Sequence, residues 1–147
     1  MEVKNFLRNI SSKRMMLHYL NSKEDSLRAE LLPHGISYDG VKVQSSPEDK
    51  LAELMSAVLE LEQKEGEIRM QVVKDLSCAQ ELFSLMPTGE YAMLLRLRYV
   101  DGIYRYMPWQ KISEIMHRDP DHLRKYMHGR ALSEAQIVWK VARFYPD

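Results

Sequence analysis

The sequence lacks the features of a secreted or membrane-bound protein. Its single cysteine, Cys78, excludes a disulfide within the chain and is compatible with a reducing cytosol. No apolar run approaches the ~20 residues that cross a bilayer. The amino-terminal stretch MEVKNFLRN is too polar for the core of a signal peptide. We therefore expect a cytoplasmic protein without a membrane partner.

Sequence signals of catalysis and of metal or cofactor binding are also missing. The chain has no glycine-rich phosphate loop, and no serine, histidine and aspartate are spaced as in a catalytic triad. Histidines and aspartates gather between His117 and His128, but no pair of these histidines has the i, i+4 spacing of a helical zinc site. We expect no enzymatic activity, no cofactor and no metal.

Glycine and proline, the residues that interrupt helices, are scarce. There are six of each in 147 residues, which leaves long uninterrupted stretches. No apolar–polar alternation is long enough to indicate a strand. A hydrophobic content of 45% with 29% charged residues is typical of a folded chain and not of a disordered one. These properties predict an all-α fold.

The first 86 residues show the pattern of two long helices. Apolar residues recur at three-four spacing from Val3 to Leu32, and a loop at 33–47 contains the breakers that end this helix. A second helix is predicted from Pro47 to Met86, with an apolar heptad stripe that Glu65 and Asp75 interrupt.

Two such helices, joined by a loop, predict an antiparallel coiled-coil hairpin over residues 1–86. The same apolar stripe could instead pair the helices of two chains in a homodimer, because both arrangements bury the same face. The hairpin region is acidic: residues 1–85 carry 11 basic and 14 acidic side chains, a net charge of −3.

Residues 87–147 predict a separate unit of shorter helices. Thr88 is placed to cap a helix over 89–100, and Asp101-Gly102 ends that helix. A short helix follows over 109–116, and the last helix starts near Asp119 or Pro120 and extends toward Phe144. With 10 basic and 7 acidic side chains in residues 86–147, this half has a net charge of +3.

The stretch Trp109–Leu132, WQKISEIMHRDPDHLRKYMHGRAL, carries the strongest functional signal. It predicts two helices that are joined by a tight turn and share a small apolar core. The first helix contributes Trp109, Ile112, Ile115 and Met116 to this core, and the second contributes Leu123, Met127 and Leu132. This is the pattern of a helix-turn-helix, which places its second helix in the DNA major groove.

The predicted DNA-contacting face is polar and mostly basic. Arginine grips guanine bidentately, and lysine and arginine both contact phosphates. The alternative is that these side chains are ordinary solvated charges on a surface helix. The candidate DNA-binding residues are Arg118 in the turn and Asp121, His122, Arg124, Lys125, His128 and Arg130 in the second helix.

Aromatic residues just before the helix-turn-helix allow two interpretations. Tyr104, Tyr106 and Trp109 lie near Arg105 in the sequence. They could stack on nucleotides, or they could fill the small core of the carboxy-terminal helices as a hydrophobic plug, which is the interpretation that we favour.

Residues 88–135 resemble region 4 of bacterial sigma factors. The likeness rests on Ile112-Ser113 and Met116-His117 in and after the first helix, and on Leu123 and Arg130-Ala131 in the second. The run LLRLRYVDG, Leu94–Gly102, is similar to the helix that precedes this motif in sigma factors. The resemblance implies a sigma-region-4-like helix-turn-helix that binds double-stranded DNA.

The whole chain also resembles a family of short phage and prophage proteins of unassigned function. Tyr38–Lys50 and the HGRAL run, His128–Leu132, carry this likeness. It implies a phage-encoded transcriptional regulator that acts in the bacterial host cytosol. The alternative is an interaction protein whose coiled coil binds RNA polymerase or another phage protein without direct DNA contact.

Overall fold

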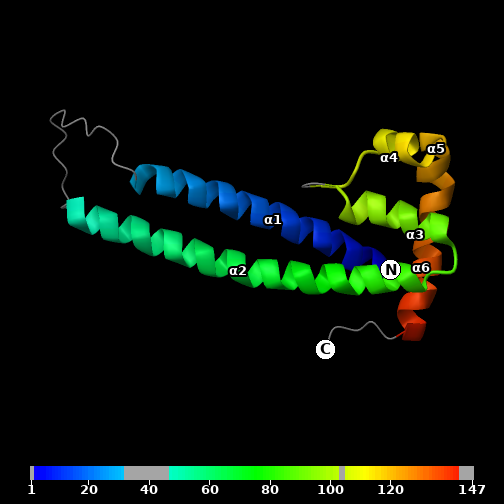
Figure 1. The fold of residues 1–147 in the computed structure, drawn as a ribbon, viewed down its shortest axis with the longest axis horizontal. Coiled ribbons are helices and arrows are strands. Elements are labelled where there is room, and N and C mark those ends of the chain that lie inside the picture. Colours follow the sequence, from blue (N-terminus) through cyan, green and yellow to red (C-terminus); the bar gives the residue numbers. More distant parts are fainter. Residues whose placement is uncertain (1, 32–46, 103–104, 143–147) are drawn as a thin grey trace. The chain divides into compact units, whose positions relative to one another are not determined.

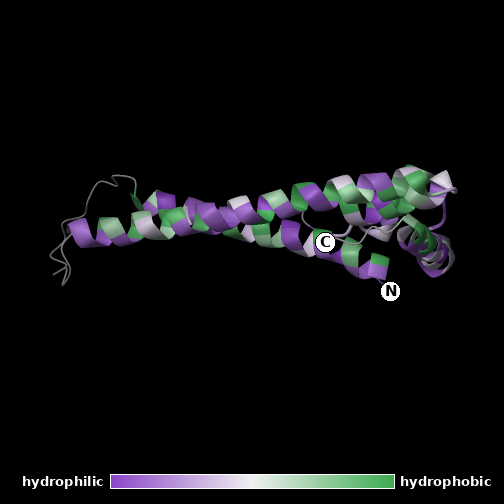
Figure 2. Ribbon diagram, turned by 90° about the horizontal axis from the view of Figure 1, so that it is seen from below, coloured by the Kyte–Doolittle hydropathy of each residue, from purple (hydrophilic) through white to green (hydrophobic). Residues whose placement is uncertain are grey.

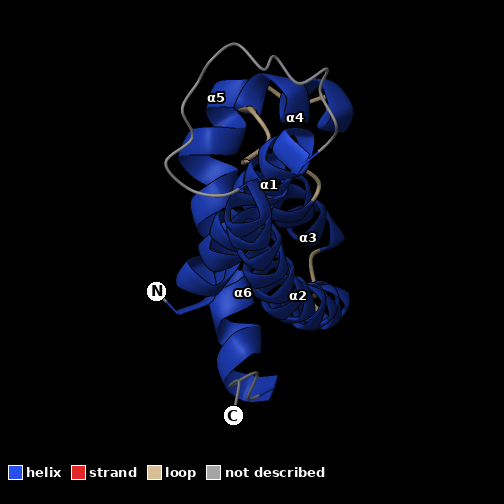
Figure 3. Ribbon diagram, turned by 90° about the vertical axis from the view of Figure 1, so that its left-hand side faces the viewer, coloured by secondary structure: helices blue, strands red, loops and turns tan. Residues whose placement is uncertain are grey.

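The structure, a computed structural model, describes residues 2–31, 47–102 and 105–142. Every regular element within these ranges is a helix, which confirms the predicted all-α class (Figures 1 and 3). None of these helices is long and apolar enough to cross a membrane. The predicted loop at 33–47 lies outside the described residues except for its last position, and so does most of Tyr38–Lys50.

The two long helices match their predicted bounds closely. Helix α1 spans Glu2–Leu31 and helix α2 spans Pro47–Leu85. Each begins with acidic side chains in its first turn, Glu2 in α1 and Glu48 with Asp49 in α2. Carboxylates at this end interact favourably with the positive end of the helix dipole.

The carboxy-terminal half contains three further helices, two of which include a π-helical stretch. A π turn holds about one residue more than an α turn, so it shifts the faces of the helix on either side of it. The predicted starts at 89, 109 and 120 are confirmed, whereas the predicted end near Phe144 lies outside the described residues. The elements are α3 (Gly89–Leu95) continuing into π-helix η1 (Arg96–Val100), α4 (Trp109–Met116), and α5 (Pro120–His122) continuing through π-helix η2 (Leu123–Met127) into α6 (His128–Ala142).

The chain divides into two compact units, each formed by segments of both long helices. One unit combines Met1–Met15 with Gln71–Asp147, and the other is Met16–Met70. Both long helices therefore contribute to both units. The physical reason is the distribution of the core, which joins the first turns of α1 to the carboxy-terminal helices.

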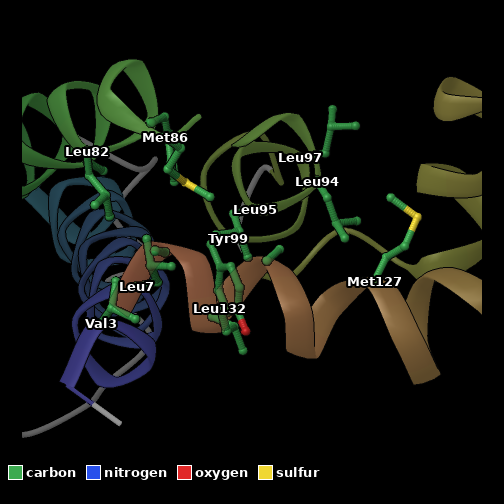
Figure 4. Close-up of a cluster of buried hydrophobic side chains, with 14 of the residues drawn as sticks. Val3, Leu7, Leu82, Met86, Leu94, Leu95, Leu97, Tyr99, Met127 and Leu132 are labelled. Atoms are coloured by element: carbon green, nitrogen blue, oxygen red, sulfur yellow. The ribbon is translucent and has the colours of Figure 1, made fainter. Parts of the chain in front are cut away.

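The first unit has one continuous hydrophobic core (Figure 4). Val3, Leu7 and Ile10 of α1 are completely buried in it, as is Leu82 of α2. The carboxy-terminal helices supply the remaining wall with Leu94, Leu95, Leu97, Tyr99, Ile112, Leu123, Met127, Ala131, Leu132, Ala135 and Trp139.

Polar contacts also join α1 to the end of η1. The last carbonyls of a helix have no partner within that helix. Here the Ser11 hydroxyl donates a hydrogen bond to the carbonyl of Tyr99 at 3.2 Å, and the Arg14 guanidinium donates to the carbonyl of Val100. The Ser11 side chain is buried, so the contact lies inside the unit. Helix α1 thus supplies hydrogen-bond donors for two backbone carbonyls at the end of η1.

The prediction that the Thr88 side chain caps α3 was wrong. Thr88 occupies the N-cap position, but its side chain makes no capping hydrogen bond. Its backbone N–H and its hydroxyl both donate to the carboxylate of Glu134 in α6, at 2.8 and 2.7 Å. Glu134, which is distant from Thr88 in the sequence, thus takes the hydrogen bonds that a local helix cap would have used.

The second unit pairs the segments of α1 and α2 that lie between residues 16 and 70. Leu20 and Val58 are its buried apolar residues. Arg28 bonds Glu24 of its own helix at 3.0 Å and also Glu62 of α2. Glu65, predicted to interrupt the apolar stripe, is buried with 4% exposure. Burial, and then the neighbouring Glu24 carboxyl, raise the pKa of Glu65.

Asp75, the other predicted interruption of the α2 stripe, belongs to the first unit. Its carboxylate accepts a hydrogen bond from the Lys13 ammonium of α1 at 2.6 Å. Both side chains are mostly buried, so this ion pair is better shielded from solvent than a surface pair. The interruption of the stripe is therefore matched by a counter-charge on α1.

Candidate nucleic-acid interface

The inner face of α4 and of the last helix is set by apolar spacing. Ile112 of α4 is completely buried, and so are Leu123 and Ala131, with Met127 nearly so. Ile115 of α4, predicted for the same buried face, is 39% exposed instead. Leu123, Met127 and Ala131 follow one another at intervals of four residues, so they lie on one side of the helix that begins at Pro120. The opposite side of that helix must then face solvent.

A three-residue turn joins α4 to the last helix. His117 ends α4 in the left-handed conformation, with φ 55° and ψ 44°, a region that residues with a Cβ rarely occupy. The backbone N–H of Arg118 donates to the carbonyl of Ser113 at 3.3 Å, and the Ser113 hydroxyl donates to the carbonyl of Arg118. These bonds to both backbone groups of Arg118 hold the turn in place.

Asp119 and Pro120 start the next helix as the sequence predicts. The Asp119 carboxylate accepts a hydrogen bond from the backbone N–H of His122 at 3.1 Å, which satisfies one of the unpaired donors at a helix start. Pro120 occupies the first turn, where its missing N–H costs nothing. Local chemistry alone therefore defines where this helix begins.

The solvent-facing side of this helix carries most of the predicted DNA-binding residues. Asp121, His122, Arg124, Lys125 and Arg130 are all exposed. An Arg124 guanidinium nitrogen lies 3.3 Å from a carboxylate oxygen of Asp121, and both side chains are more than half exposed. An exposed pair of this kind is weak, so the guanidinium can exchange it for another anion.

Arg118, the candidate in the turn, bonds an acidic residue of another helix. Its Nε donates to the carboxylate of Glu90 in α3 at 2.5 Å, and both side chains remain partly exposed. The structure therefore directs Arg118 toward α3. A DNA phosphate would have to compete with Glu90 for its guanidinium.

His128 does not belong to the exposed face on which the sequence placed it. Its ring is half-buried, and its Nε2 is hydrogen-bonded to the Tyr99 hydroxyl at 2.8 Å. The Trp109 ring packs against it at an interplanar angle of 73°, with ring centroids 5.0 Å apart. The π-helical segment just before His128 adds about one residue to its turn. A prediction that assumes 3.6 residues per turn throughout the helix therefore assigns His128 to the wrong side.

Burial governs the protonation of His128. Removal from water, together with the positive charges of Arg98, Lys4 and Arg8, lowers the pKa of the ring to about 4. At neutral pH the ring is therefore uncharged, and its Nε2 can accept a hydrogen bond from the Tyr99 hydroxyl. An uncharged, internally bonded ring acts as a packing element between η1 and the last helix.

Stability is expected to fall as the pH falls from about 6.5 to about 4. Within this window the unfolded chain binds a proton at His128 and the folded protein does not, so protonation favours unfolding. Because the ring is only half-buried, we expect a loss of about 1 to 2 kcal/mol. Urea midpoints across this range should show a shallower dependence in His128→Gln than in the wild type. Parallel curves for the two proteins would contradict this assignment.

Sequence reasoning missed Arg98, which organises the aromatic residues before α4. Its guanidinium lies 4.5 Å from the ring centroid of Trp109 and 5.1 Å from that of Tyr106. It also donates a hydrogen bond to the carbonyl of Met107 at 2.7 Å. Burial lowers the pKa of this arginine. The sequence analysis considered Arg105 as the cation beside these aromatic residues instead of Arg98.

The two aromatic rings beside Arg98 pack against the core. Tyr106 and Trp109 are both partly buried there, as expected for a hydrophobic plug. Tyr104, the third aromatic residue considered, lies outside the described residues.

Tyr126 is a second residue that the sequence analysis passed over. Its side chain is 58% exposed on the same helix as Arg124 and Lys125, and its ring lies 5.6 Å from that of His122. An exposed aromatic among cations offers apolar contact to a base or sugar. The exposure could not be read from the sequence because tyrosine occurs on both core and surface faces.

The surroundings of Cys78 do not activate its thiol. Cys78 is half-buried, and burial raises the pKa of its thiol, which disfavours the thiolate. Across the ranges that the structure describes, no group of three histidine, cysteine, aspartate or glutamate residues is arranged to hold a metal ion.

Comparison of the chain with models of known protein families, with curated proteins and with solved structures gives no match. The assignment of a function therefore rests on the geometry of the chain itself.

Proposed function

We propose that the protein is a DNA-binding transcriptional regulator of phage or prophage origin that acts in the host cytosol. In this proposal α4 and the helix from Pro120 form a sigma-region-4-like helix-turn-helix, and the coiled-coil hairpin of α1 and α2 serves as its support. The second helix enters the major groove with its exposed side.

The observation that carries the proposal is the division of one helix into two chemically different faces. Leu123 and Met127 lie in the core, whereas Arg124 and Lys125 between them are exposed. Arg130 continues the exposed side toward α6. A rigid helix that turns cations outward, next to a short turn, matches what recognition of phosphates and guanine requires.

The proposal predicts salt-dependent binding to duplex DNA. We expect Arg124→Ala to weaken binding about 3-fold, because on DNA of random sequence its guanidinium contributes through contact with a phosphate. Lys125→Ala should weaken binding about 3-fold and reduce the slope of log K against log salt by about 1, as loss of one phosphate contact requires. Fluorescence anisotropy of a labelled random-sequence duplex between 50 and 200 mM KCl measures both quantities.

Lys140→Ala is the matched control. Lys140 is exposed near the other end of the same continuous helix, so it tests whether loss of any lysine on this helix has the same effect. The control should bind as the wild type does. Absence of binding at 50 mM KCl, or equal effects of the Lys125 and Lys140 variants, would contradict the proposed DNA-contacting face.

A different surface of the first unit supports the alternative function, binding of RNA polymerase or another phage protein. A concavity of about 210 Å³ lies between α2 and the helix of α3 and η1. Such a groove could receive an apolar side chain of a partner helix. Capture of a polymerase subunit by a protein that does not bind DNA would favour this alternative. The groove is lined by Leu76, Ala79, Gln80, Phe83, Arg96 and Val100.

A further inference from the structure

The two compact units carry opposite net charge. The first unit has 15 basic and 10 acidic side chains, a net charge of +5, and the second has 6 basic and 11 acidic side chains, a net charge of −5. The difference between residues 1–85 and 86–147 is smaller, −3 against +3, because residues 1–15 count there with the acidic hairpin. The fold thus adds positive charge from the start of α1 to the unit that contains the proposed DNA-contacting face. This charge comes from Lys4, Arg8, Lys13 and Arg14, against the single carboxylate of Glu2.

Two of these four cations have no partner within the part of the chain that the structure describes. Lys13 pairs with Asp75 and Arg14 bonds a backbone carbonyl, so both are engaged inside the unit. Arg8 is exposed and Lys4 is partly exposed, and neither side chain forms an ion pair or a hydrogen bond with a described residue. Hydrophilic residues recur between the hydrophobic ones along both long helices (Figure 2). Lys4 and Arg8 are therefore available to an anion from outside the chain.

The side of α1 that carries Lys4 and Arg8 is tied to the junction of η1 with the last helix. Lys4, Arg8 and Ser11 lie on this one side, because they follow one another at intervals of four and three residues. The Ser11 hydroxyl donates to the carbonyl of Tyr99 at 3.2 Å, and the Tyr99 hydroxyl is hydrogen-bonded to Nε2 of His128 at 2.8 Å. The positive charges of Lys4 and Arg8 also lower the pKa of the His128 ring, as expected for cations close to that ring.

His128 lies at the margin of the proposed DNA-contacting face. Its ring is half-buried, and it follows the exposed Arg124 and Lys125 by about one turn of the same continuous helix, a rise of about 6 Å. Arg124 has only a weak surface pair with Asp121, and Lys125 has no ion pair among the described residues. Exposed cations from two helices far apart in the sequence thus lie near His128.

We propose that Lys4 and Arg8 extend the DNA interface onto α1, where they bind phosphates beside the groove that the helix from Pro120 occupies. This inference rests on the proposed function, because it adds contacts to the same DNA. It gives the start of α1 a direct part in binding, in addition to its part in the core.

Phosphate recognition requires exposed positive charge on a rigid element and no readout of bases. Helix α1 meets this requirement because bonds hold it on both sides of the two cations. The backbone N–H of Val3 donates to the side-chain oxygen of Gln136 in α6 at 2.9 Å, and Ser11 bonds the end of η1. Lys4 and Arg8 therefore keep a fixed position relative to the helix that carries Arg124.

The test compares DNA binding of the full chain with that of three double variants. Lys4→Ala/Arg8→Ala should weaken binding to a random-sequence duplex about 10-fold and reduce the slope of log K against log salt by about 2, because two phosphate contacts are lost. Lys4→Arg/Arg8→Lys keeps both charges and should bind as the wild type does. The matched control, Lys74→Ala/Lys140→Ala, removes the same charge from two exposed positions of the same unit and should weaken binding less than about 2-fold.

The outcomes separate this inference from the proposed function. Absence of salt-dependent binding by the wild type would overturn both. If Lys125→Ala weakens binding and Lys4→Ala/Arg8→Ala does not, or if the patch and control variants lose affinity equally, only the part assigned to α1 is overturned. Urea unfolding should give equal midpoints for the wild type and Lys4→Ala/Arg8→Ala, because neither side chain is in the core.

The acidic second unit of another copy is the other anionic partner that the charges allow. Sedimentation at low salt tests it without DNA. A wild-type oligomer that dissociates on Lys4→Ala/Arg8→Ala would assign the two cations to self-association and overturn their assignment to phosphates. A wild type and a variant of equal mass, together with the loss of DNA affinity in the variant, would support the extended interface.

Discussion

Replacing Leu7 with alanine should lower the free energy of unfolding by about 3 kcal/mol, within the range of 2–5 for a buried leucine. Leu7 is completely buried although it lies near the start of the chain. Its neighbours in the core include Leu82 of α2 and Leu132 of α6 (Figure 4). The alanine variant would leave a cavity where helices far apart in the sequence meet.

Leu85→Ala is the control for this change. Leu85 ends α2 and is 51% exposed, so the same substitution removes little buried surface and should cost less than about 1 kcal/mol. Urea unfolding followed by circular dichroism measures both variants. Equal costs for Leu7→Ala and Leu85→Ala would mean that α1 is not part of the core of the first unit.

A fragment of residues 87–147 should for the same reason fail to fold. It lacks Val3, Leu7 and Ile10, and it loses the Ser11 and Arg14 side chains that bond the carbonyls at the end of η1. The carbonyls would remain available only to water, and the apolar side of the carboxy-terminal helices would be exposed. Dispersed amide signals in an NMR spectrum of this fragment would contradict the shared core.

Replacing Gly102 with alanine should cost about 2 to 3 kcal/mol, because the new methyl group cannot fit without moving the backbone. A Cβ at this position would lie 2.0 Å from the carbonyl oxygen of Arg105 and 3.0 Å from the backbone nitrogen of Met107. Both atoms belong to the backbone, so they cannot move aside as a flexible side chain would.

Gly129→Ala makes the same chemical change at a site with open space. A Cβ there meets nothing within 4 Å, and the residue lies within helix α6. Alanine should therefore stabilise the protein by about 0.5 to 1 kcal/mol through its higher helix propensity. Thermal or urea unfolding of both variants is the measurement. Similar effects of the two substitutions would show that close approach is not what requires glycine at position 102.

The two glycines also separate what a sequence pattern predicts from what packing requires. The sequence suggested that Gly102 follows a helix end because of its backbone freedom. In the structure its φ is not in the left-handed region, and the close approach of the Arg105 carbonyl explains the glycine instead. The left-handed position belongs to His117, at the end of α4.

The helices themselves were predictable because their signals are local. Three-four apolar spacing defined α1 and α2, and the Asp119–Pro120 pair defined the start of the last helix. Each of these signals depends on residues within a few turns of one another. The exposed positions of Arg124, Lys125 and Arg130 follow from the same periodicity.

Contacts between distant residues were not predictable. Thr88 bonds Glu134, Arg98 lies between two aromatic rings, and His128 bonds Tyr99 instead of facing solvent. The π-helical stretches in η1 and η2 change the face on which the following residues lie. A prediction based on 3.6 residues per turn does not include this change of helix face.

By itself the sequence determined the helical class, the bounds of the helices, the tight turn after Met116 and the basic character of the last helix. These properties depend on propensity, capping and spacing, which act within one segment. The tertiary structure alone decided that α1 completes the core of the carboxy-terminal unit and that His128 is internal. The reason is that a buried side chain contacts segments far apart in the chain, and the sequence of one segment does not show which other segment packs against it.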